Sequence, residues 1–182
     1  MMRWALLYAR SREVPVSAAI VVVAVTLLGL PEGDLRLSAF AAAVGVAALA
    51  VGLGAHDVAL DRGAAFGWPP RRAAHLLLGG LFVGGLLLTV GPDVPDHAVV
   101  WRNVAGLGGL AALGALLLGS RTAWALPVTW TGATLVVPSG DLWFEELLSW
   151  PVQPAGTTSA TTTALVLGLT GLLAGTARTT RR

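Results

Sequence analysis

The chain has 182 residues, of which 55% are apolar and only 12% charged, and its net charge is +2. A soluble domain carries roughly 25% charged residues, so much of the usual polar surface is missing, and the mean hydropathy is +0.74. The basic residues, all arginine, are scattered, which excludes a nucleic-acid-binding face. The absence of cysteine excludes disulfides, thiolate metal sites and cysteine nucleophiles.

The N-terminal segment MMRWALLYARSRE, residues 1–13, mixes aromatic and aliphatic side chains with arginines. This mixture is typical of a short helix in the inner membrane interface. It is equally typical of a basic segment that only orients the first span. No A-x-A cleavage pattern follows the first apolar run, so we interpret that run as an uncleaved signal anchor.

Six apolar runs follow, and each predicts a transmembrane helix. A helix needs about 20 residues to cross a hydrocarbon core of about 30 Å. We place the spans at 14–30, 35–55, 73–91, 100–119, 122–138 and 160–177. Because proline ends or distorts a helix, Pro31 and Pro92 mark the ends of the first and third spans. Pro127 predicts a kink in the fifth.

The arginines predict the orientation of these spans, because short loops rich in Arg stay in the cytoplasm. If the N-terminus is inside, only Arg36 and Arg102 of the twelve arginines fall outside. Most acidic residues then fall on the outer side. Both termini are therefore expected in the cytoplasm.

The segment HDVALDRGAAFGWPPRR, residues 56–72, interrupts the apolar runs between the second and third spans, and we expect it to be a cytoplasmic loop. Two functions are open for it: a docking surface for a partner, or a topology signal with solvated charges. Its charged residues are Asp57, Asp61, Arg62, Arg71 and Arg72.

Small and polar residues within the spans suggest helix contacts. GLFVG (80–84) and GLLAG (171–175) place glycines four apart, a spacing that lets helices approach closely in lipid. With 23 glycines in the chain, chance explains such matches equally well. Thr129, Thr131 and Thr134 are expected to form hydrogen bonds within their own helix.

Arg102 lies at the outer edge of the fourth span. One interpretation pairs it with Asp93, Asp96, Glu145 or Glu146. The favoured interpretation is that its side chain snorkels to the lipid headgroups.

The stretch DLWFEELLSW (141–150), within residues 139–151, predicts an amphipathic helix on the outer face between the fifth and sixth spans. Acidic residues and a serine recur on one face, and the tryptophans suit a membrane interface. The helix should lie along the outer leaflet or dip into it. Its candidate functional residues are Asp141, Trp143, Glu145, Glu146 and Trp150.

The sequence predicts no catalysis. His56, His75 and His97 are too scattered for a haem or metal site, and no Ser-His-Asp or paired-carboxylate set lies at one depth. Without any lysine there is no Walker lysine. We therefore expect no cofactor, no metal and no enzyme activity, so that any ATP hydrolysis resides in a partner subunit.

This layout resembles the type-2 ABC exporter permeases. Their six spans have both ends inside, an N-terminal interfacial helix, a coupling helix between spans two and three, and short outer helices between spans five and six. MMRWALLYARSRE, HDVALDRGAAFGWPPRR and DLWFEELLSW stand in those three places. The strings HDVALDR, WRNVAGLGGLAALGALLLG and WPVQPAG also resemble small bacterial membrane proteins associated with such transporters.

The resemblance covers nearly the whole chain and implies one all-helical transmembrane domain, 1–182, in the plasma membrane and in contact with its lipid. It implies a permease subunit that works with a separate ATPase and with a second permease copy, identical or not. Asp57 and Asp61 would then face basic residues of the ATPase, and 141–150 would help form an outer gate. Because the chain is shorter than typical permeases, the alternative is a non-transporting scaffold or accessory subunit.

Overall fold

The protein is described by a computed structural model, which covers residues 14–29, 34–51, 69–89, 96–136 and 142–177. Within these ranges the chain is helical and contains no strand. The predicted all-helical class is therefore confirmed for the described part of the chain.

Six long helices occupy the positions of the six apolar runs. They are α2 (Val14–Gly29), α3 (Leu35–Val51), α5 (Pro69–Leu87), α6 (His97–Leu117), α7 (Ala125–Val136) and α9 (Thr158–Ala177). A short helix, α8 (Trp143–Leu148), and two 3-10 turns, Ser120–Thr122 and Trp150–Val152, complete the described elements.

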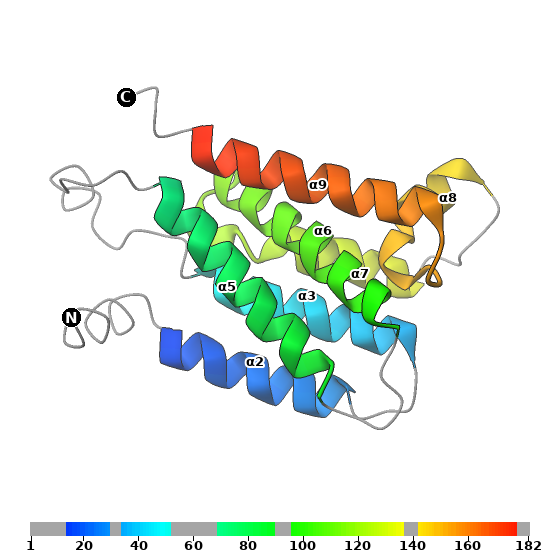
Figure 1. Cartoon of the computed structure of the whole chain (residues 1–182), viewed down its shortest axis with the longest axis horizontal. Helices are drawn as coiled ribbons and strands as arrows, with labels where there is room; N and C mark the ends of the chain where they lie inside the picture. The colour runs from blue at the N-terminus through cyan, green and yellow to red at the C-terminus, as the bar shows by residue number, and fades with distance from the viewer. Residues whose placement is uncertain (1–13, 30–33, 52–68, 90–95, 137–141, 178–182) are drawn as a thin grey trace, which may run out of the picture.

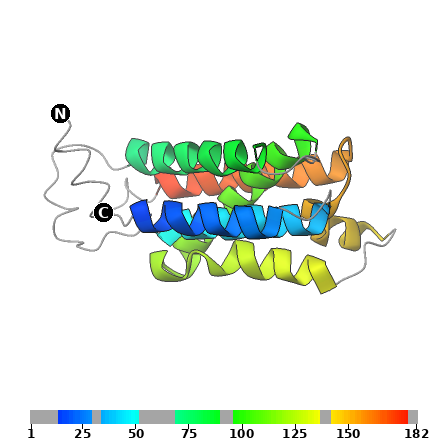
Figure 2. The ribbon, with the colours of Figure 1, turned by 90° about the horizontal axis from the view of Figure 1, so that it is seen from below.

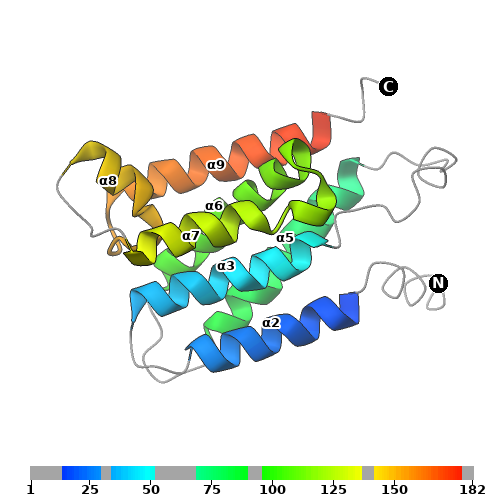
Figure 3. The same cartoon turned by 180° about the vertical axis from the view of Figure 1, so that it is seen from behind.

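Successive long helices run in opposite directions along one common axis, as Figures 1 and 3 show. The start of α2 and the end of α9 lie at one end of the bundle, which we call the terminal end. The end of α3 and the start of α5 lie there too. The opposite end carries α8, and we call it the α8 end.

The centre of the bundle is formed by α3 and α6. They contact each other, and α5 and α7 cover them from opposite sides (Figure 2). The flanks are α2, beside α3, and α9, beside α6. Small side chains permit this close arrangement, and α3 alone buries Ala39, Ala41, Ala42, Ala43, Ala47 and Ala50.

Glycines bring α6 and α9 into backbone contact. A Cβ atom on Gly109 would collide with the backbone of Leu167, and one on Gly171 would collide with the backbone of Gly109. In the GLLAG stretch, Gly171 is therefore a helix contact, whereas Gly175 has nothing within 4 Å of its would-be Cβ.

The GLFVG stretch on α5 lies against α6. A Cβ on Gly80 would stand 3.1 Å from the side chain of Val104, and the ring of Trp101 covers Gly84. Both glycines of this stretch are thus helix contacts, which settles the question that the sequence left open.

Two predicted boundaries are wrong. Helix α5 begins at Pro69, so Arg71 and Arg72 belong to its first turn and not to the preceding loop. Proline is tolerated there because the first N–H groups of a helix have no internal partner. The fifth predicted span starts too early, because α7 begins at Ala125 and not at residue 122, and Pro127 lies in its first turn, where it causes no mid-helix kink.

Among the described residues, two helices are long and apolar enough to cross a membrane: His97–Leu117 in α6 and Thr158–Gly175 in α9. The most apolar part of α6 is 67% buried, as in the core helix of any protein, whereas that of α9 is only 17% buried. The exposed apolar face of α9 is therefore the more informative of the two. Pro15–Leu27, Leu35–Val51 and Ala73–Leu87 are apolar but shorter.

Candidate functional site

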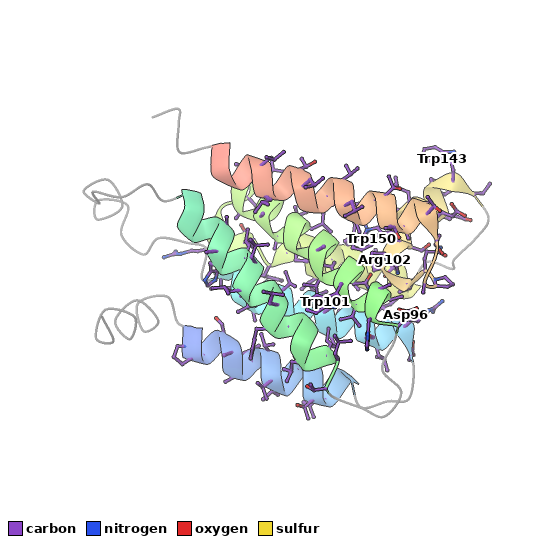
Figure 4. All side chains as sticks on the ribbon, viewed as in Figure 1. Asp96, Trp101, Arg102, Trp143 and Trp150 are labelled. Atoms are coloured by element: carbon purple, nitrogen blue, oxygen red, sulfur yellow. The ribbon has the colours of Figure 1, made fainter. Side chains whose placement is uncertain are left out.

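Two adjacent polar residues of α6 form the centre of the candidate site at the α8 end (Figure 4). Asp96 caps α6, since its carboxylate accepts a hydrogen bond of 2.9 Å from the backbone N–H of Ala98. The helix therefore starts at His97, and Arg102 and Asn103 follow in its second turn. They are 8% and 2% exposed.

Both side chains bind backbone carbonyls of the turn that follows α8. The Nη1 and Nη2 atoms of Arg102 donate to the carbonyls of Pro154 and Gln153, at 3.1 and 2.7 Å. The Nδ2 atom of Asn103 donates to the carbonyl of Pro151 at 2.7 Å. We call Arg102, Asn103 and these three carbonyls the Arg102 clamp.

The sequence around the clamp explains why these carbonyls are free to accept. Proline supplies no N–H and ends regular structure, and WPVQP places two prolines around a single 3-10 turn, Trp150–Val152. Carbonyls past the end of a helix have no helical partner. The donors of α6 therefore replace the missing hydrogen bonds at Pro151 and Gln153, and the carbonyl of Pro154 accepts from Thr157 as well as from Arg102.

The favoured prediction for Arg102, snorkelling to the headgroups, is wrong. Its guanidinium points into the protein and binds carbonyl oxygens. Within the described residues it forms no ion pair: Asp96 caps α6, and a Glu145 carboxylate oxygen lies 3.4 Å from the N–H of Leu142. Asp93 lies outside the described residues.

Further hydrogen bonds extend the clamp to α7 and α8. Gln153 Nε2 donates to Ser149 Oγ at 2.8 Å, and Ser149 Oγ donates to the carbonyl of Glu145 at 2.6 Å. Trp130 Nε1, on α7, donates to the carbonyl of Leu148 at 3.1 Å. The segment between α7 and α9 is thereby attached to both α6 and α7.

The predicted amphipathic helix is only partly right. Trp143 is 77% exposed, as expected of an interface residue, but α8 ends at Leu148. Trp150 is completely buried and stacks over Gly106, and no described residue accepts its Nε1–H. Because Pro151 ends the helix and Gly106 leaves room for an indole, Trp150 turns into the core rather than toward lipid.

The other predicted site residues do not join the clamp. Arg71 and Arg72 stand in the first turn of α5, at the terminal end and therefore far from the clamp. The segment 1–13 and the residues Asp57, Asp61, Arg62 and Asp141 lie outside the described residues. The described candidate residues thus lie at opposite ends of the bundle: Arg71 and Arg72 at the terminal end, and Trp143, Glu145, Glu146 and Trp150 at the α8 end.

Polar residues away from the clamp serve the helices themselves. His75 Nε2 is 3.1 Å from the carbonyl of Leu49 and joins α5 to α3. Thr129 and Thr134 donate to carbonyls of their own helix, as predicted. Thr131 does not, because its buried hydroxyl has no partner among the described residues.

Sequence reasoning missed Asn103 and Gln153 as members of the site. An Arg-Asn pair within an apolar run, together with a second stretch that carries two prolines, was the available signal. The Arg-Asn pair indicates hydrogen-bond donors on one helix, and the two prolines indicate unpaired carbonyls in another segment. The sequence does not show that these donors and carbonyls contact each other.

No protein-family model matches this chain, and no curated protein or solved structure is significantly similar to it. The described part of the chain is therefore defined by its own architecture: a helical bundle of alternating direction with an apolar exterior and a buried arginine clamp at one end.

Proposed function

We propose that the chain is a multi-pass membrane protein in which the six long helices run across the bilayer, α7 together with the turn Ser120–Thr122 that precedes it, and both termini are cytoplasmic. The observation that carries this proposal is the exterior of α2, α5 and α9. Exposed side chains there include Val16, Ile20, Leu78, Leu81 and Leu169, and residues 15–27, 73–89 and 158–175 contain no charged side chain. Such a surface suits hydrocarbon, whereas a soluble protein rarely exposes large apolar patches.

The distribution of charge along the bundle supports the orientation. The described acidic residues, Asp34, Asp96, Glu145 and Glu146, all lie at the α8 end. Arg121, in the turn between α6 and α7, is exposed at the terminal end. Since arginine-rich loops stay in the cytoplasm, the terminal end is the cytoplasmic side of this proposal.

Within the membrane, the chain would act as the permease subunit of an ABC-type exporter, in a dimer with a second permease and coupled to a separate ATPase. The resemblance of the sequence layout supports this role. So does the placement of Val51 and Pro69, because the segment that joins them starts and ends on the proposed cytoplasmic side. An ATPase would dock on that side.

The second candidate is a non-transporting scaffold or accessory subunit, and the composition of the core favours it. Among the described residues the buried polar side chains are Ser17, Arg102, Asn103, Thr131, Thr134 and Ser149. All but Ser17 lie on α6, on α7 or in the segment that follows α8, so no continuous polar path joins the two ends of the described bundle.

Co-purification distinguishes the two functions. We would express this chain with the ATPase encoded nearest to it, purify through a tag on this chain, and measure ATP hydrolysis after reconstitution into vesicles. A permease is expected to retain the ATPase and to lose hydrolysis coupling in the double variant Asp57→Ala, Asp61→Ala. The matched control is Asp34→Ala, at the opposite end.

Each outcome supports one function. Coupling that depends on the two aspartates and not on Asp34 supports the permease. A complex whose rate of ATP hydrolysis is the same in the wild type, in the double variant and in Asp34→Ala supports the scaffold. No association with the ATPase contradicts the exporter proposal.

A further inference from the structure

An apolar groove of about 280 Å³ lies between α5, α6 and α9. Its floor is made of small residues, including Ala105 and Gly108 of α6. Leu81 of α5 and Leu169 of α9 stand at its rim, each more than half exposed. A Cβ on Gly108 would have nothing within 4 Å, so the floor is open.

One residue of this groove carries a hydrogen-bond donor in its side chain. Trp101 lies in the second turn of α6, near the α8 end (Figure 4), and every other lining residue is aliphatic or glycine. The edge of its six-membered ring covers Gly84, so the N–H edge of the indole points away from α5. This N–H has no hydrogen-bond partner among the described residues, and the side chain is 38% exposed.

The groove therefore has a chemical order along its length. It is apolar through the middle of the bundle, and Trp101, whose N–H has no partner among the described residues, lines it near the α8 end. A phospholipid has the same order, with a hydrocarbon chain below and ester and phosphate oxygens at the interface, where tryptophan N–H groups normally find partners.

We propose that this groove binds one acyl chain of a membrane phospholipid, and that Trp101 Nε1 donates to an oxygen of its ester or phosphate group. This inference rests on the membrane location proposed above. Lipid tails are as apolar as leucine, so the preference comes from shape and from the hydrogen bond rather than from the hydrophobic effect.

Filling the floor of the groove tests the proposal. We would purify the protein in mild detergent and quantify the phospholipid that stays bound, by native mass spectrometry. Gly108→Leu is expected to abolish binding because the new side chain occupies the open floor. Gly85→Leu is the matched control, since Gly85 also has open space around it but does not line the groove.

A second variant tests the hydrogen bond. Trp101→Phe keeps an aromatic ring but removes the N–H, and loss of one hydrogen bond is expected to weaken phospholipid retention roughly fivefold. Trp124→Phe, at the terminal end, is the control and should retain the lipid.

Equal lipid in Gly108→Leu and Gly85→Leu overturns the proposal. So does a Gly108→Leu protein that keeps its lipid but changes from dimer to monomer, since the groove would then hold a second copy. Alkaline extraction of the same membranes tests separately whether the protein is embedded in the membrane. A protein that resists extraction while Gly108→Leu keeps its lipid overturns only the groove proposal, whereas a protein that is extracted overturns the membrane location as well.

Discussion

At the residue scale, the burial of Arg102 is explained by what surrounds it. An ionised group loses its hydration on burial, and this cost is tolerated only where hydrogen bonds replace the water. Two backbone carbonyls do so here. The contact gives the carbonyl of Gln153 its donor, whereas the carbonyl of Pro154 also accepts from the hydroxyl of Thr157.

Arg102→Met is therefore expected to destabilise the protein by about 2 kcal/mol, because it removes two hydrogen bonds from a charged donor and leaves the carbonyl of Gln153 without its donor. For a chain of this length that corresponds to a fall in Tm of roughly 4–8 °C. The measurement is thermal unfolding in detergent.

Arg36→Met is the matched control, because Arg36 lies at the same end but is exposed. If the two variants fall by the same amount, the clamp does not stabilise the protein. Arg102→Lys should lie between Arg102→Met and the wild type, since a lysine keeps the charge but not the fork of donors.

The sequence predicted where Arg102 stands along its helix but not where its side chain points. Its position follows from the apolar run that it interrupts. Its direction depends on carbonyls about 50 residues further along the chain, and only the folded structure reveals that contact. Trp150 is a similar case, since its burial depends on the room that Gly106 leaves on another helix.

At the element scale, the tightest contact in the bundle joins α6 and α9 through glycine. Dispersion attraction between closely approaching backbones holds such pairs together in lipid, where no hydrophobic effect drives them. The α6–α9 pair is therefore more sensitive to one added methyl group than any contact made by side-chain ends.

Two neighbouring glycines allow this sensitivity to be measured. Gly109→Ala is expected to destabilise the protein by about 1–3 kcal/mol, because its methyl group would collide with the backbone of Leu167. Gly108→Ala should be neutral or stabilising by up to about 1 kcal/mol, because alanine favours the helix and the site is open. Unfolding in SDS or by heat compares the two.

Equal stability of the two alanine variants would show that α6 and α9 do not touch at Gly109. The comparison is internally matched, since both substitutions add one methyl group to the same helix.

The six long helices were predicted because long apolar runs without charges leave little choice of structure. The errors lie at helix ends, where local chemistry decides. Pro69 starts α5 earlier than the hydropathy suggested, and Pro151 ends the outer helical segment sooner. Helix α7 begins at Ala125, three residues later than the predicted span, although Ala123 and Trp124 before it are apolar.

At the scale of the whole molecule, the alternation of helix direction separates the chain into two ends with different charges. Cysteine labelling tests the orientation without background, since the natural chain has no cysteine. In intact cells, a membrane-impermeant maleimide is expected to react with Ala155→Cys, at the α8 end, and not with Arg121→Cys. Both residues are exposed, so accessibility to the reagent depends only on the side of the membrane.

Opening the membrane should make Arg121→Cys reactive as well. The reverse pattern would show that the α8 end faces the cytoplasm. Protection of both cysteines in intact cells would contradict a position across the plasma membrane.

The sequence did not predict which helices lie at the centre of the bundle and which lie at its flanks. Hydropathy ranks each helix alone, whereas the central place of α3 depends on alanines that let four neighbours approach it at once. The candidate coupling residues Asp57 and Asp61 remain predictions, since they lie outside the described residues.

The Arg102 clamp also sets an order of events during synthesis. Its donors are made first, and its acceptors, Gln153 and Pro154, follow about 50 residues later. At about 5–20 residues per second, α6 waits roughly 3–10 s with an unpaired arginine before its partners leave the ribosome. During that interval the arginine has no carbonyl to bind and must keep contact with water or headgroups. The clamp therefore cannot close until the segment between α8 and α9 has been synthesised.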